Sequence, residues 1–60
     1  MINFEGHKID LNKHKFEVQS MDTGTTWKVR AVLSPDEFVY SSQTFSSHDE
    51  AEAFINDLKN

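Results

Sequence analysis

SSHDEAEAFINDLKN, residues 46–60, is the stretch in which several independent local signals agree, and they predict a helix. Ser47 can cap the first turn, and Glu50 can accept a hydrogen bond from the amide of that cap residue, which is the capping-box pattern. The apolar residues that recur at i, i+3, i+4 and i+7 are Ala51, Phe54, Ile55 and Leu58. This spacing places them on one face of a helix, and such a face has to be covered by the rest of the fold.

Upstream of this helix, apolar and polar residues alternate with a period of two, which is typical of half-buried strands. Residues 27–33 are the clearest case, with Trp27, Val29, Ala31 and Leu33 on one face and Lys28, Arg30 and Val32 on the other. Residues 15–19 form a second alternating segment. Within residues 2–11 the parity changes at Gly6, which indicates a bulge or a sharp bend in a strand or hairpin.

A fourth strand is expected from Phe38 to Phe45, but the sequence leaves its inward face open. Phe38 and Tyr40 favour one parity. Val39 and Phe45 favour the other, and a bulge at residues 41–43 would satisfy both.

Consecutive strands joined by short turns favour an antiparallel meander. We therefore predict an α+β fold in which three or four antiparallel strands carry the C-terminal helix on one face, with residues 1–60 as a single domain. A chain of this length buries only about 60% of its unfolded surface, and it has no cysteine for a disulfide or a thiolate metal site. Because one helix covers only one side of a sheet, the other side should face water or a partner.

The net charge of -4 is unevenly distributed, because residues 1–34 carry five basic and four acidic side chains, whereas residues 35–60 carry one and six. A surplus this modest usually keeps a protein soluble and does not by itself mark a recognition surface. No segment approaches the roughly eighteen apolar residues of a membrane span. The N-terminus is not a basic and then apolar leader, so we expect a cytoplasmic protein that does not contact a membrane.

No motif in the chain predicts an enzyme. Asp22-Thr23-Gly24 matches the signature of aspartic proteases, but the chain is too short for their barrel, and Asp and Gly are typical of hairpin turns. The three histidines, His7, His14 and His48, lie in separate segments without cysteines, so surface positions explain them better than a zinc site. Without a recognisable Ser-His-acid set or a glycine-rich phosphate loop, we expect no catalysis, no metal and no cofactor.

Residues 27–32 (WKVRAV) and 46–51 (SSHDEA) resemble the second half of a double-stranded-RNA-binding domain, which implies two strands followed by a helix. That family places lysines at the start of this helix to straddle RNA phosphates. Here the positions hold His48, Asp49 and Glu50, so the charge is reversed. Most of the chain is also similar to short uncharacterised bacterial and phage proteins, a likeness that implies fold and origin and carries no functional residues.

The leading hypothesis is a small non-catalytic binding module that acts through a protein partner or through self-association, as a phage or bacterial accessory or inhibitor protein would. Its basis is the small size, the absence of a catalytic set and the uncovered side of the sheet. The expected partner-binding residues are Trp27, Lys28, Arg30 and Tyr40, with Glu17 as a charge partner.

Two other interpretations stay open. In the first, the sheet binds nucleic acid and places Lys15, Lys28 and Arg30 on phosphates, so that binding weakens steeply with salt. In the second, the carboxylates of the helix mimic DNA; these are Asp49, Glu50, Glu52 and Asp57. Mimicry is the weaker hypothesis because these carboxylates span only a short helix.

Overall fold

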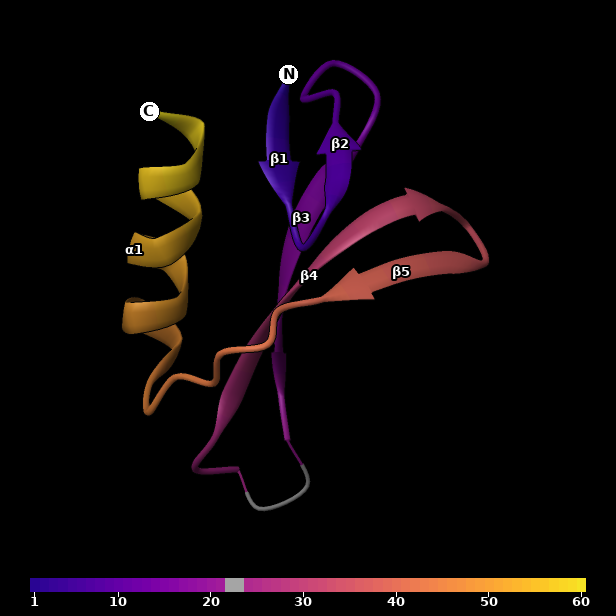
Figure 1. The fold of residues 1–60 in the computed structure, drawn as a ribbon. Coiled ribbons are helices and arrows are strands. Elements are labelled where there is room, and N and C mark those ends of the chain that lie inside the picture. The colour runs from indigo at the N-terminus through magenta and orange to yellow at the C-terminus, as the bar shows by residue number, and fades with distance from the viewer. Residues whose placement is uncertain (22–23) are drawn as a thin grey trace.

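The computed structural model describes residues 1–21 and 24–60 and shows a run of strands followed by one helix (Figure 1). The elements are β1 (Ile2–Phe4), β2 (His7–Ile9), β3 (Lys15–Ser20), β4 (Trp27–Ser34), β5 (Glu37–Tyr40) and α1 (His48–Lys59). Among the described residues, β1 and β2 form a two-stranded sheet and β3, β4 and β5 form a three-stranded antiparallel sheet. The α+β class and the meander are confirmed, and the strands divide into two sheets.

A two-residue turn between β1 and β2 explains the parity change in the N-terminal segment. Phe4 pairs with His7, so Glu5 and Gly6 form the turn, with φ angles of 51° and 81°. Positive φ at both central residues is the type I′ geometry, whose twist suits two antiparallel strands. The feature at Gly6 is therefore a hairpin, and both Phe4 and Ile9 are buried in the core.

β3 and β4 pair in a register that agrees with their alternating sequences. Phe16 lies opposite Ala31, and both pack in the core region. Val18 lies opposite Val29 in the same way. Helix α1 packs on these two strands, so their apolar rows form the covered face of the sheet. The turn expected at Asp22-Thr23-Gly24 includes residues 22–23, which lie outside the described residues.

β5 is shorter than the predicted fourth strand, because the chain leaves the ladder at Ser41 and not at Phe45. Ser41 is only 2% exposed, and its hydroxyl accepts a hydrogen bond from the Val29 amide (3.3 Å) and donates one to the Gln43 carbonyl (2.8 Å). The chain returns to β4 at Phe45, which exchanges two backbone hydrogen bonds of 2.8 Å with Trp27.

The detour after β5 settles which residues of this strand face the core. Val39 and Phe45 pack against the core cluster. Phe38 and Tyr40 are instead 39% and 45% exposed on the opposite face.

The register is irregular in β4 between Val32 and Ser34. It also shifts after Ser41, because Ser41 bonds to Val29 whereas Phe45 pairs with Trp27, so the stretch from Ser41 to Phe45 has two more residues than the matching part of β4. An even number of extra residues keeps Val39 and Phe45 on the same face.

Helix α1 begins as predicted, with one difference in its cap. The Ser47 hydroxyl accepts a hydrogen bond from the Glu50 amide (3.2 Å), as a cap residue should. The Glu50 carboxylate, however, accepts from the amide (3.0 Å) and the hydroxyl of Ser46, not from the amide of Ser47. Ser46 offers one carboxylate oxygen two donors, whereas the Ser47 backbone offers one, which explains the correction.

The core lies between the three-stranded sheet on one side and α1 and the β1–β2 hairpin on the other (Figure 1). From the helix, Ala51 and Ile55 are 0% and 5% exposed, and Phe54 and Leu58 pack beside them, so the predicted apolar face of the helix is confirmed. Phe4 joins the parts, because its ring meets that of Phe16 edge-on at 5.2 Å and that of Phe54 at 6.5 Å.

Candidate functional site

The side of the three-stranded sheet that faces away from α1 carries a continuous set of side chains, called here the open face. Its members are Lys15, Glu17, Gln19, Lys28, Arg30, Val32, Phe38 and Tyr40. The register brings them together, because Glu17 lies opposite Arg30 and Arg30 lies opposite Tyr40. Residues directly opposite in an antiparallel sheet point to the same side, so three strands contribute to one surface.

Arg30 is the centre of the open face, and every part of its guanidinium has a neighbour. Its Nε donates to Glu17 Oε1 at 2.8 Å, and its Nη2 lies 2.6 Å from the same oxygen. Its Nη1 donates to the Tyr40 hydroxyl at 3.3 Å. The guanidinium carbon also lies 4.2 Å from the centre of the Phe38 ring, in cation–π contact. The Arg30 side chain is therefore held in one position by three partners on two neighbouring strands.

These contacts shift the ionisation of both charged partners. The hydrogen bond from Arg30 lowers the pKa of Glu17 below its ordinary value of 4.5, and Lys15, 3.4 Å away, adds to this effect. Hydrogen bonds to Tyr40 and to Glu17 raise the pKa of Arg30 above its ordinary value. The centre of the open face thus holds a fixed ion pair at neutral pH, in which the charges of Glu17 and Arg30 are paired with each other.

The structure brings four of the five predicted partner-binding residues together and separates the fifth. Glu17, Lys28, Arg30 and Tyr40 lie on the open face. Trp27 lies on the covered face, where it packs against the core and meets the His48 ring edge-on at 5.3 Å. Trp27 and Val29 are two positions apart in β4, so both point to the covered face. Trp27 is therefore packed within the fold, whereas the other four residues lie on the open face.

Phe38 is a member of the open face that sequence reasoning did not select. It lies opposite Val32 and has the same parity as Tyr40, which was selected. That shared parity was the available signal, but it could not be used while the inward face of this strand was undecided. Phe38 and Tyr40 now form an exposed aromatic pair next to Arg30.

A hollow of about 500 Å³ adjoins the open face at the end where β3 begins and β4 ends. Its lining residues are Asn12, Lys13, His14, Lys15, Val32, Leu33, Ser34 and Pro35. His14 already has a structural role, because its Nδ1 accepts a hydrogen bond from the Asp10 amide at 3.1 Å. The hollow shares Lys15 and Val32 with the open face and extends that surface with one further lysine, Lys13.

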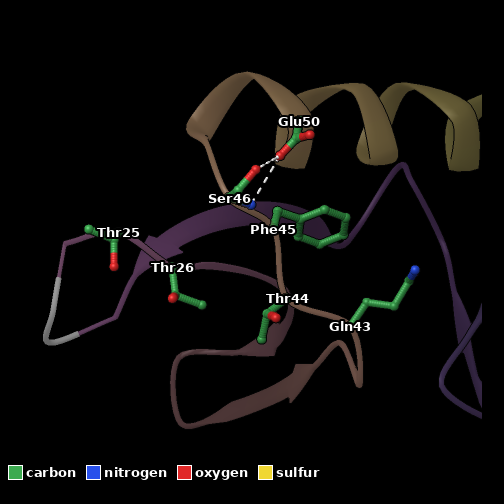
Figure 2. Close-up of a pocket in the computed structure, with 7 residues that line it drawn as sticks. All are labelled: Thr25, Thr26, Gln43, Thr44, Phe45, Ser46 and Glu50. Carbon is green, nitrogen blue, oxygen red and sulfur yellow. Dashed lines mark hydrogen bonds between the residues drawn. The ribbon is translucent and has the colours of Figure 1, made fainter.

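A second hollow, of about 470 Å³, lies beside the first turn of α1. It is lined by Thr25, Thr26, Gln43, Thr44, Phe45, Ser46 and Glu50. Figure 2 shows the residues that line it. The Glu50 carboxylate is directed at Ser46, whose amide and hydroxyl lower the pKa of Glu50. The Phe45 ring packs 5.0 Å from that of Phe54. The carboxylate and the ring of this hollow therefore serve the helix cap and the core.

The histidines are spread over the molecule, as their spacing suggested. His7 is exposed on β2, His14 supports a turn, and His48 starts α1 with its Nε2 3.6 Å from Glu52. Among residues 1–21 and 24–60, no group of three or more His, Cys, Asp or Glu side chains is arranged to hold a metal ion.

Comparisons of the chain with protein-family models, with curated proteins and with solved structures found no match. In the part of the chain that the structure describes, no helix has the length and apolar character needed to cross a membrane.

Proposed function

We propose that this chain is a non-catalytic binding module that contacts a protein partner, or a second copy of itself, through the open face. The observation that carries the proposal is the fixed cluster at its centre. Arg30 is held there by Glu17 and Tyr40 and stacks on Phe38, while the two rings remain 39% and 45% exposed. Ordered aromatic and arginine side chains on an uncovered surface are the residues that dominate binding energy in protein interfaces.

The cluster also favours binding because the Arg30 side chain is already ordered in the free chain. Association costs roughly 0.5–1.5 kcal/mol for each flexible side chain that becomes fixed. Arg30 is already fixed by contacts within its own chain, so a partner that lands on it does not have to order it. The neighbouring Val32 supplies further apolar surface between Lys15 and Phe38.

The same contacts make the open face less suited to a nucleic acid. Arg30 uses its donors on Glu17 and Tyr40, and Lys15 also lies beside Glu17. A phosphate backbone would have to displace this carboxylate or accept its repulsion, and the net charge of -4 opposes approach of a polyanion. A protein partner with an apolar and aromatic surface would neither be repelled by Glu17 nor be opposed by the net negative charge.

Affinity capture with a matched control tests the proposal. The double variant Phe38→Ser, Tyr40→Ser removes the exposed rings of the open face. Leu11→Ser is the control, because Leu11 is 41% exposed but lies outside the open face. We expect the wild-type chain and the control to retain the same protein from lysate, or to show the same mass in solution above that of a monomer, and the double variant to lose both.

Three results would contradict the proposal. The first is a wild-type chain that is a strict monomer and retains nothing. The second is retention by the double variant equal to that of Leu11→Ser. The third is tight binding of single- or double-stranded RNA or DNA that weakens steeply with salt and is lost in the double variant, which would assign the open face to nucleic acid.

A further inference from the structure

The turn between β1 and β2 contains a residue whose backbone is strained. Glu5 has a φ of 51°, and within the described part of the chain no other residue except glycine has a positive φ. Both central residues of a type I′ turn need positive φ, and asparagine, aspartate or glycine normally fill these positions. A longer side chain costs stability in this conformation and persists where the surrounding structure holds it. The reason for a glutamate here therefore has to lie in the contacts of its side chain.

The turn does not use the Glu5 side chain. Phe4 and His7 pair on either side of the turn, and the Asn3 side chain adds a hydrogen bond, because its Oδ1 accepts from the Gly6 amide at 3.2 Å. Both hydrogen bonds of the Glu5 carboxylate go to another part of the molecule.

The carboxylate reaches the chain just after β5. Its Oε2 accepts from the Ser42 amide at 2.9 Å and from the Ser42 hydroxyl at 3.2 Å, across 37 positions of sequence. Hydrogen bonds to a carboxylate are charge-assisted and stronger than those between neutral groups. Among the described residues, no other side chain of the hairpin forms a hydrogen bond or an ion pair with residues 24–60. Figure 1 shows the turn of the hairpin at the level where the chain leaves β5.

We infer that Glu5 is a latch, which fastens the β1–β2 hairpin to the end of β5, and that this position holds glutamate for its reach and not for its fit to the turn. The hairpin shares no ladder with the three-stranded sheet, so backbone pairing does not fix one to the other. Ser42 is a firm anchor for the latch, because the preceding residue, Ser41, is bonded to Val29 of β4. The latch goes beyond the proposed function and does not depend on it.

The latch makes the hairpin a strap that is fastened at two places of different strength. Phe4 and Ile9 are buried in the core, whereas Glu5 and Ser42 meet at the exposed surface. Exposed contacts open at a lower free energy than the core does. The tip of the hairpin therefore opens and closes on Ser42 while the core stays folded.

Hydrogen exchange at the Ser42 amide tests the latch, with Glu5→Asp as the main variant. Aspartate keeps the charge and is favoured before glycine in this turn, but its side chain is one methylene too short to reach Ser42. We expect the Ser42 amide of Glu5→Asp to exchange at least about tenfold faster than in the wild-type chain, the factor that corresponds to the loss of one hydrogen bond to a charged group. Glu5→Gln keeps the reach and an acceptor oxygen, so its Ser42 amide should exchange at a rate between the two.

Two controls separate the latch from other effects. The Ile55 amide reports on the core and should exchange at the wild-type rate in both Glu5 variants. Gly6→Ala strains the same turn without touching the carboxylate, so it should leave the exchange of the Ser42 amide near that of the wild-type chain.

Four results overturn the inference. A Ser42 amide that exchanges equally fast in the wild-type chain and in Glu5→Asp shows that the carboxylate does not hold it. Faster exchange in Glu5→Gln than in Glu5→Asp assigns the effect to charge and not to reach. Equal acceleration at Ile55 assigns it to global unfolding, and acceleration in Gly6→Ala equal to that in Glu5→Asp assigns it to the turn.

Discussion

Ser41 follows the last residue of β5, and its side chain takes the place of a backbone partner there. It is the only polar residue that is buried within the described part of the chain. Its hydroxyl replaces the strand partner that the Val29 amide would otherwise need. Ser41→Ala leaves this amide unpaired in an apolar setting, which should lower the free energy of unfolding by about 1–3 kcal/mol. Chemical denaturation measures the loss, with Ser42→Ala as the control because the Ser42 hydroxyl makes an exposed hydrogen bond to Glu5 (3.2 Å). Equal losses in the two variants would show that Ser41 is not needed.

Two carboxylates make folding sensitive to acid. Arg30 lowers the pKa of Glu17, and Ser46 lowers that of Glu50, in each case below the ordinary value of 4.5. A carboxylate with a lowered pKa in the folded state stabilises that state above its unfolded pKa, and the contribution disappears as the pH falls through the folded pKa.

We therefore expect these contributions to be complete at neutral pH and to be lost progressively below about pH 4.5. Thermal unfolding midpoints measured across this range give the slope of stability against pH. Glu17→Gln and Glu50→Gln should each flatten it, and the double variant should flatten it most, because the two sites share no partners. A double variant with the wild-type slope would assign the acid sensitivity to other groups.

At the scale of the elements, the β1–β2 hairpin depends on its turn. Gly6 has a φ of 81°, and a side chain added there would meet no atom within 4 Å, so substitution costs only backbone strain. Gly6→Ala should reduce stability by about 1–2 kcal/mol, and Gly6→Asn by less, because asparagine tolerates this conformation better. Denaturation of the two variants tests the order. A smaller loss for alanine than for asparagine would be incompatible with a type I′ turn.

Elements determined by neighbouring residues were predictable, and those determined by distant contacts were not. The cap at Ser47 and the spacing of Ala51 and Ile55 are local, so helix α1 could be predicted almost to its ends. The end of β5 depends on a hydrogen bond between Ser41 and Val29, which are far apart in the sequence. A period-two pattern cannot show such a contact, and the predicted strand was therefore too long.

Some residues of the candidate site could be predicted from the sequence, and others could not. Glu17 and Arg30 could be selected because both lie on the polar rows of alternating strands, and the register then makes them partners. Trp27 was selected for its aromatic character, which does not determine which face is exposed. The parity of β5 was undecided in the sequence because apolar residues occupy both of its faces, so Phe38 could not be assigned to the surface.

At the scale of the whole molecule, the two sheets share one core without sharing a ladder. β1 and β2 form hydrogen-bonded pairs with each other, and the hairpin contributes the buried residues Phe4 and Ile9 to the cluster that includes Val29 and Ile55. Nothing local in the sequence indicates that the hairpin lies beside the helix over the sheet. That arrangement follows from the need to cover the apolar face of the sheet, which one short helix cannot cover alone.

Phe4 is where this arrangement can be tested, because its ring contacts both Phe16 of the sheet and Phe54 of the helix. Phe4→Ala removes the ring from the shared core, at a cost of about 3–5 kcal/mol. A domain of this size has a total stability of only about 3–9 kcal/mol. We therefore expect Phe4→Ala to lose most or all of its folded population, while Phe4→Leu, which keeps much of the volume, should remain folded.

The readout is Trp27 fluorescence compared with hydrogen exchange at the Ile9 amide, because Trp27 reports on the meander and Ile9 on the hairpin. If the core is shared, the two probes report one unfolding transition in the wild-type chain. In Phe4→Ala, the native emission of Trp27 and the protection of the Ile9 amide should then be lost together. A variant in which Ile9 exchanges freely while Trp27 keeps its native emission would mean that the hairpin is an appendage. The three-stranded sheet and the helix would then be stable without it, and the open face would be held in place by those elements alone.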